Sequence, residues 1–228
     1  MDFGAFEKKI DYSFKNKKLL ETVFTHRSFL NENRAVGMEH NERLEFLGDA
    51  VLELISTDFL YKKYPAKPEG DLTSYRAALV NTNSIADAAT ALDMNQFLRL
   101  SRGESRDTGR ARNIILANSF EALLGALYLD GGYEVAADFV ALHILYKTEA
   151  IVHNRTWQDA KSKFQELSQE QAGLTPSYIV VDESGPDHEK RFVVAACIGS
   201  SRIAVGDGRS KQEAEQAAAQ KALVVKGW

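Results

Sequence analysis

The sequence has little cysteine and no long uninterrupted hydrophobic run. Its single cysteine, Cys197, excludes an internal disulfide, and together with five scattered histidines it provides no ligand spacing typical of zinc sites. No run of apolar residues approaches the length of about 18 that a membrane-spanning helix needs. The first residues, MDFGAFEKKIDYSF, also lack the basic and then apolar order of a signal peptide. These absences predict a cytoplasmic protein that has no membrane partner.

The sequence also lacks an excess of positive charge. The chain has 28 lysine and arginine residues against 32 aspartate and glutamate residues, which gives a formal net charge of -4. Bulk charge therefore does not attract a polyanion, and binding to nucleic acid would depend on local basic patches or on metal ions. The 228 residues do include 44% hydrophobic residues, enough for one large and one small hydrophobic core.

The larger, N-terminal part of the chain follows a helical pattern. Apolar residues recur at steps of three and four, which predicts helices that bury one face in a common core. Prolines and glycines separate several of these segments, which span residues 17–32, 42–64, 71–92, 113–130 and 133–152. The pattern predicts an all-α domain over residues 1–150.

After a predicted linker at residues 151–157, the pattern changes. A helix comes first, then three short β-rich segments and an alanine-rich helix, which cover residues 159–173, 176–183, 190–199, 201–208 and 210–226. The order α-β-β-β-α predicts a small α+β domain over residues 158–228. We expect both of its helices on one face of an antiparallel sheet.

The segment HNERLEFLGDAVLEL, residues 40–54, places three carboxylates on one side of an amphipathic helix. Glu42, Glu45 and Asp49 share that side, so their like charges must either face water or meet a counter-charge. A second pair, Asn118 and Glu121, lies three residues apart on another apolar helix. Oxygen ligands of this kind suit magnesium if the two helices cross. A solvated helix face is the alternative that the spacing leaves open.

These segments resemble the ribonuclease III family. HNERLEFLGDAVLEL is similar to the family signature, LLETVFTHRSFLNE to its leading helix, PEGDLTSYRAALVNTNSIADAA to its central segment and ILANSFEALLGALYLDGGYEVA to its second acidic helix. The C-terminal module resembles the double-stranded RNA-binding domain of bacterial members. The resemblance implies an all-α ribonuclease III endonuclease domain that forms a homodimer, followed by a small α+β (α-β-β-β-α) double-stranded RNA-binding domain.

The resemblance also implies the active site and the reaction. Glu45, Asp49, Asn118 and Glu121 match the metal-binding positions of the family, with Asp49 and Glu121 as the catalytic residues. The implied reaction is magnesium-dependent hydrolysis of double-stranded RNA by metal-activated water, with Mn²⁺ as an alternative ion. The products carry 5′-phosphate ends and short 3′ overhangs. The implied role is the processing of rRNA and mRNA precursors, with no small-molecule substrate.

Position 118 departs from the family pattern, which has aspartate there. The amide oxygen of Asn118 still ligates magnesium, but it lacks the formal charge that helps to strip water from the ion. Two alternatives to an active enzyme therefore stay open. One is a catalytically impaired double-stranded RNA-binding protein of the same fold, and the other is a structural partner that uses the dimer alone.

Three more residues match positions at the dimer. Glu42 and Glu69 match acidic positions that line a valley formed by the two subunits. Phe46 matches the aromatic residue that the family inserts into a socket on the partner subunit, and burial of Phe46 in its own core is the alternative.

The C-terminal module is expected to read duplex RNA by shape, through contacts with two minor grooves and the phosphates between them. The family makes these contacts from the first helix, the loop between the first two strands and the start of the last helix. The matching residues are Gln165, Glu166, His188, Ser210 and Lys211. The family usually has a second lysine after the first, and its replacement here by Gln212 predicts looser binding. Ordinary surface roles are the alternative for Gln165, His188 and Lys211.

A basic loop precedes the second acidic helix. The segment SRGESRDTGRARN contains Arg102, Arg106, Arg110 and Arg112. Such a loop is often only a solvated connection, but beside an acidic site it is also suited to contact phosphates.

Overall fold

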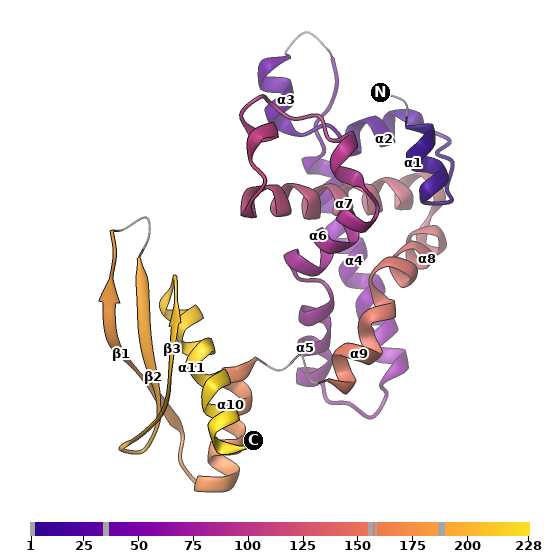
Figure 1. Cartoon of the computed structure of the whole chain (residues 1–228). Coiled ribbons are helices and arrows are strands. Elements are labelled where there is room, and N and C mark those ends of the chain that lie inside the picture. The colour runs from indigo at the N-terminus through magenta and orange to yellow at the C-terminus, as the bar shows by residue number, and fades with distance from the viewer. Residues whose placement is uncertain (1–2, 34–36, 155–156, 158, 187–189) are drawn as a thin grey trace. The chain divides into compact units, whose positions relative to one another are not determined.

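The structure is a computed structural model that describes residues 3–33, 37–154, 157, 159–186 and 190–228. The chain forms two compact units, Met1–Trp157 and Gln158–Trp228 (Figure 1). The first is helical, and the second combines a three-stranded antiparallel sheet with two helices. The predicted fold class is therefore confirmed.

In the first unit, two 22-residue helices form the centre and shorter helices surround them. The α-helices are α1 (Gly4–Lys9), α2 (Lys17–Val23), α3 (Arg27–Glu32), α4 (Glu42–Lys63), α5 (Glu69–Leu79), α6 (Thr82–Ala91), α7 (Arg110–Gly131), α8 (Tyr133–His143) and α9 (Thr148–His153). In the described part of this unit, short 3₁₀ turns lie between some of these helices, at η2 (Met94–Phe97), η3 (Glu104–Arg106) and η4 (Leu145–Lys147).

Helix α7 is the core helix of this unit. Its apolar residues face inward on nearly all sides, and Phe120, Leu123, Leu124 and Leu127 are completely buried. By length and composition α7 alone among the described helices would be apolar enough to cross a membrane, but most of it is buried inside the unit. It packs most extensively against α4, which it crosses (Figure 1).

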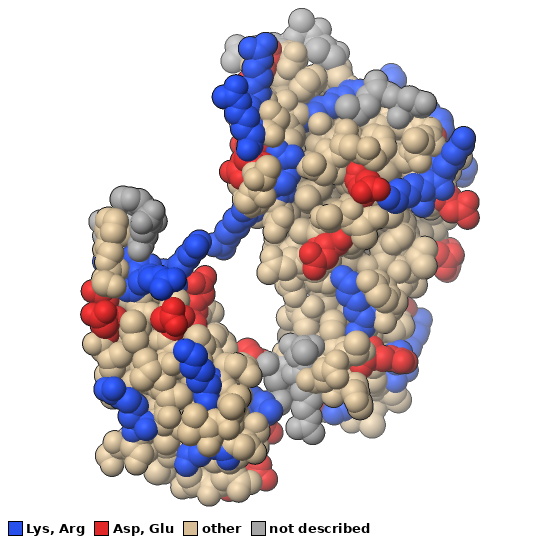
Figure 2. All heavy atoms as spheres, viewed as in Figure 1, with Lys and Arg blue, Asp and Glu red and all other residues tan. Residues whose placement is uncertain are grey.

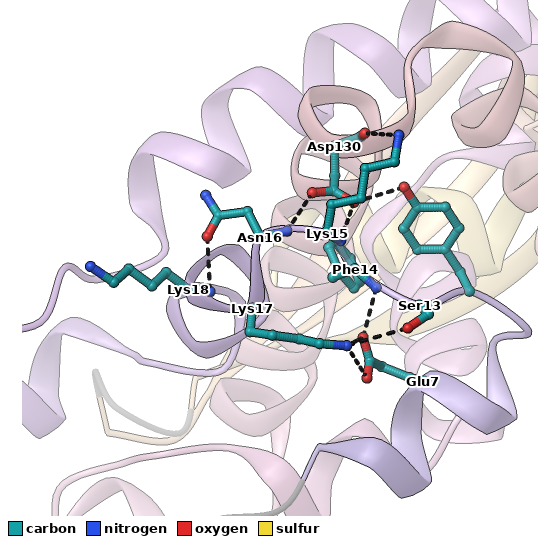
Figure 3. A network of polar contacts seen from close by, with 9 residues as sticks. Glu7, Ser13, Phe14, Lys15, Asn16, Lys17, Lys18 and Asp130 are labelled. Carbon is teal, nitrogen blue, oxygen red and sulfur yellow. Dashed lines mark hydrogen bonds and ion pairs between the residues drawn. The ribbon is translucent and has the colours of Figure 1, made fainter.

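A polar network ties the N-terminal segment to the end of α7 (Figure 3). The Asp130 carboxylate accepts hydrogen bonds from the backbone N–H groups of Lys15 and Asn16, each at 2.9 Å, and from the Tyr12 hydroxyl at 2.8 Å. Partial burial alone would raise the pKa of Asp130. The hydrogen bonds and the Lys15 charge have a larger combined effect in the other direction, so the pKa of Asp130 is lowered. The network therefore fixes one end of the helix that carries Glu121.

In the second unit, both helices lie on one face of the sheet. Its elements are α10 (Ala160–Ala172), β1 (Pro176–Ser184), β2 (Arg191–Ile198), β3 (Ser201–Gly208) and α11 (Lys211–Lys226), with strand order β1-β2-β3. The alanine-rich sequence of α11 allows its backbone to approach the sheet closely. A Cβ at Gly206 would lie 2.1 Å from the backbone nitrogen of Ala218, which is itself fully buried.

Candidate metal centre and RNA-binding surface

The crossing of α4 and α7 depends on two glycines that bring the helix backbones into contact. A Cβ at Gly48 would lie 1.7 Å from the backbone oxygen of Glu121, and a Cβ at Gly125 would lie 2.3 Å from that of Leu44. No larger side chain fits at either position. The contact brings the first turns of α4 beside the middle of α7. Our sequence reasoning missed both glycines, although glycine inside a helical pattern signals close backbone approach.

A buried asparagine holds the start of α4 in place. The side chain of Asn41 is not a helix cap but donates to the backbone oxygen of Val23 at 3.1 Å and to Ser119 Oγ at 3.4 Å. Its backbone N–H donates to the Thr25 oxygen at 3.0 Å. Asn41 is only 1% exposed, so each lost bond would leave a buried polar group unsatisfied. Asn41 and Ser119 had no distinguishing signal in the sequence.

The crossing brings the predicted metal-binding residues together. Burial, together with the smaller effect of the negative charges of Asp49 and Glu45, raises the pKa of Glu121 to about 7. Burial also raises the pKa of Glu45, with contributions from the charges of Glu42 and Asp49, while a hydrogen bond with the Asn118 side chain opposes this rise. Three carboxylates and one amide therefore interact at one place, as the sequence predicted for crossing helices.

These residues fit a hydrated magnesium ion better than a fully protein-coordinated ion. In the described part of the chain, no three histidine, cysteine, aspartate or glutamate side chains are arranged to hold a metal ion together. Magnesium, however, usually keeps several waters and binds through only one or two carboxylates. A cation would also relieve the repulsion that raises the Glu121 pKa.

The two predicted valley carboxylates lie in different surroundings. Glu42, at the start of α4, pairs with the Arg27 guanidinium at 3.0 Å and interacts electrostatically with Glu45. Glu69, on α5, accepts a hydrogen bond from the Thr73 hydroxyl at 2.8 Å. Within one chain Glu42 thus borders the carboxylate cluster, whereas Glu69 lines a separate cavity.

That cavity lies beside an exposed apolar stripe on α4. Phe46 is 83% exposed, so the alternative that it fills its own core is wrong. Leu54 and Tyr61 follow it along α4 and are 58% and 72% exposed. The cavity has a volume of about 410 Å³ and is lined by Thr57, Leu60, Tyr61, Lys67, Glu69, Leu72, Thr73 and Arg76.

The basic loop is fixed at its ends and exposed in between. Arg112 donates to Asn95 Oδ1 at 2.6 Å and to the backbone oxygen of Glu104 at 2.5 Å, so it is structural. Arg102, Arg106 and Arg110 are exposed and form no ion pair within the described residues. Figure 2 shows Lys and Arg side chains projecting from the surface of the first unit.

The predicted RNA-binding residues of the second unit lie on its surface where they are described. Gln165 and Glu166 are exposed on α10, and Lys211 begins α11 with its ammonium 5.7 Å from the centre of the Phe192 ring. His188 falls outside the described residues.

Ser210 caps the start of α11, and Glu213 adds a second hydrogen bond at the same end. The Ser210 Oγ accepts from the Glu213 backbone N–H at 3.1 Å, and the Glu213 carboxylate accepts from the Arg209 backbone N–H at 2.9 Å. Glu213 therefore stabilises the helix start at which the RNA contact is predicted, even though its charge is unfavourable for phosphate.

Comparisons with known proteins agree with this architecture. A family model described as "Ribonuclease-III-like" matches residues 16–148, and the "Double-stranded RNA binding motif" model matches residues 160–225. "Ribonuclease 3" of Streptococcus sanguinis is 46% identical over 219 residues, which are 96% of this chain and 94% of the relative. "Ribonuclease 3" of Oceanobacillus iheyensis is 44% identical over 225 residues, which are 98% and 97% of the two chains.

A solved structure is similar to the first unit. It is the nuclease domain of ribonuclease III from Campylobacter jejuni, which is 39% identical with a TM-score of 0.58. The similarity covers 66% of this chain and all of that domain. That structure is described as showing flexibility in a region involved in dimer formation.

Proposed function

The chain belongs to the ribonuclease III family of double-stranded RNA endonucleases, and we propose that its reaction depends on magnesium held at the α4–α7 crossing. Glu45, Asp49 and Glu121 would supply carboxylate oxygens and Asn118 an amide oxygen. The observation that carries this proposal is the gathering of these carboxylates at a partly buried point, where burial and then the charges of Asp49 and Glu45 raise the pKa of Glu121 to about 7. Mn²⁺ has the same preference for oxygen ligands and is proposed as an alternative ion.

Each residue of the site has a role before any ion arrives. The glycine contact and the Asn41 hydrogen bonds fix the two helices, so the ligands do not have to be reorganised. Glu121 retains a proton close to neutral pH and releases it when a cation binds. When bound, magnesium lowers the pKa of a coordinated water and stabilises the leaving oxygen of the phosphodiester. The proposed products carry 5′ phosphates and short 3′ overhangs.

We propose a homodimer formed through the exposed apolar stripe of α4. Phe46 projects into solvent, and the same face contains a cavity that is large enough to take an aromatic side chain from a second copy. A dimer would supply two sites, one for each RNA strand. Phe46→Glu should give monomers by light scattering, with Glu53→Gln on the same helix as the control. A Phe46→Glu protein that stays dimeric would contradict this interface.

Two surfaces are proposed to bind the duplex. The start of α11 with Lys211 presents positive charge and a helix N-terminus to phosphates. The free arginines of the basic loop, Arg102, Arg106 and Arg110, precede the helix that carries Glu121 and are proposed to contact phosphates beside the site. We propose structured rRNA and mRNA precursors in the cytoplasm as the natural substrates.

A cleavage assay tests the proposed chemistry. Labelled, fully paired RNA is incubated with the protein in magnesium, with EDTA and single-stranded RNA as controls. We expect cutting of the duplex alone and only with the metal. Equal cutting in EDTA would contradict the metal site, and cutting of single-stranded RNA at the same rate would contradict duplex selectivity.

A further inference from the structure

Trp157 is the last residue of the first unit, and its side chain packs into that unit. The centre of its indole ring lies 4.9 Å from that of Tyr75 on α5, with the ring planes at 74°, which is an edge-to-face contact. Tyr75 is only 1% exposed and makes the same kind of contact with Tyr64 at 5.6 Å. Trp157 itself is partly buried against the hydrophobic core. These rings therefore anchor the end of the first unit to α5.

The contact that holds Trp157 is apolar. Its indole N–H is buried and has no hydrogen-bond partner in the part of the chain that the structure describes. A buried indole N–H usually finds a partner, and one that lacks a partner makes burial of the ring less favourable. The attraction comes instead from the apolar area that the ring shares with Tyr75 and the core. A phenylalanine ring is therefore expected to make the same contact.

The second unit begins with a residue that is held just as firmly. The Asp159 carboxylate caps α10, where it accepts from the Ser162 backbone N–H at 2.8 Å and from the Ser162 hydroxyl at 2.7 Å. It also accepts from the side-chain amide of Gln216, on α11, at 3.1 Å. In the sequence, a single residue separates Asp159 from Trp157. Each end of this short connection is therefore held by its own unit.

The Trp157 contact sets the length of chain that connects the two units. The two Cα–Cα steps from Trp157 to Asp159 span at most about 7 Å. Without the contact, the last residue held in the first unit would be Asn154, whose backbone N–H donates to the Ala150 oxygen at 3.0 Å at the end of α9. The five steps from Asn154 to Asp159 span at most about 18 Å.

The length of this connection matters because both units are proposed to bind the same duplex. Once one unit has bound, the other meets the RNA at an effective concentration that falls roughly as the −3/2 power of the connection length. A change from two steps to five lowers that concentration roughly fourfold.

We propose that Trp157 is a positioning residue, whose contact with Tyr75 shortens the connection between the nuclease domain and the RNA-binding domain and thereby strengthens their joint binding to one duplex. This inference rests on the proposed duplex-binding surfaces of both domains.

The test measures KM and kcat in magnesium for cleavage of a fully paired RNA of about 32 base pairs, twice the length that one such RNA-binding domain spans. Trp157→Ala should raise KM roughly fourfold and leave kcat unchanged. Trp157→Phe should keep the wild-type KM, because the ring contact does not depend on the indole N–H. Thermal unfolding checks that both variants remain folded.

Two insertions separate the length of the connection from the loss of the indole ring. Gly-Ser-Gly inserted directly after Trp157 keeps the ring contact but lengthens the connection from two steps to five, so it should raise KM as Trp157→Ala does. The same insertion directly after Asn154 lies before the anchor and should leave KM unchanged.

Two results would overturn the positioning role while leaving the proposed function intact. One is a Trp157→Ala protein with the wild-type KM, and the other is an equal effect of the two insertions. If the wild type does not cleave the duplex at all, the proposed function is wrong and this inference is wrong with it.

Discussion

Replacing Gly48 with alanine should separate the two helices that carry the metal-binding residues. The added Cβ would lie 1.7 Å from the backbone oxygen of Glu121 and 2.5 Å from its carbonyl carbon, whereas real Cβ contacts under 3.0 Å are essentially never seen. Both obstructing atoms belong to the backbone of a buried helix, so no side chain can rotate away. The helices must therefore move apart by roughly 1 Å.

This movement should affect both stability and activity. Overpacking costs about 1–3 kcal/mol, and the Gly48 contact belongs at the upper end because backbone atoms obstruct it. For a domain of this size, about 3 kcal/mol lowers the melting temperature by roughly 6–12 °C. The same movement displaces Glu45 and Asp49 from Asn118 and Glu121. A displacement of about 1 Å should lower the cleavage rate roughly 100-fold.

Calorimetry and single-turnover cleavage of duplex RNA measure the two effects. Gly70→Ala is the matched control, because Gly70 lies in the first turn of α5 and a Cβ there meets no atom within 4 Å. Alanine at that position should leave activity unchanged and stabilise slightly, by about 0.5–1 kcal/mol. A Gly48→Ala protein that melts and cleaves like the wild type would refute the idea that backbone contact builds the site.

Three further predictions follow from single side chains. In the metal-free protein, the raised pKa of Glu121 should make the free energy of unfolding fall as pH rises from about 4.5 to about 7, because the folded state keeps a proton that the unfolded state has released. Urea unfolding in EDTA measures this fall, and Glu121→Gln should lack it. Asp130→Asn should cost about 1 kcal/mol near neutral pH, and the gap should close on acidification, because the lowered pKa of Asp130 stabilises the fold only above that pKa. Lys211→Ala should weaken duplex affinity and reduce its salt slope by about 1 in fluorescence anisotropy, while cleavage at saturating RNA stays unchanged.

The sequence was sufficient to predict the two fold classes but not all helix boundaries. The segment at residues 17–32 has one helical pattern, yet the structure divides it into α2 and α3. Thr25 pairs with Arg99 at the break, and His26 caps the start of α3. This division depends on a partner more than 70 residues away, which local periodicity does not contain. The predicted segment 71–92 is likewise divided, into α5 and α6, but here a local signal was present, since Asn81 caps α6 through the Ser84 backbone N–H.

The candidate site was predictable in composition but not in construction. Spacing placed carboxylates on single helix faces, and the family resemblance selected which of them should meet. Neither the spacing nor the resemblance revealed the buried contacts of Asn41 or the backbone contact at Gly125, because both depend on how two distant helices cross. The sequence shows which side chains could bind a metal ion, whereas tertiary packing determines which of those side chains lie together.

The most direct measurement of the central claim compares the wild type and Glu121→Ala on the same labelled duplex RNA in magnesium, with binding and cleavage followed in parallel. We expect Glu121→Ala to bind the duplex as tightly as the wild type but no longer to cut it, because the variant lacks the most buried carboxylate of the site and retains both proposed RNA-binding surfaces. A Glu121→Ala protein that still cuts the duplex at the wild-type rate would contradict the assignment of the catalytic centre to the α4–α7 crossing.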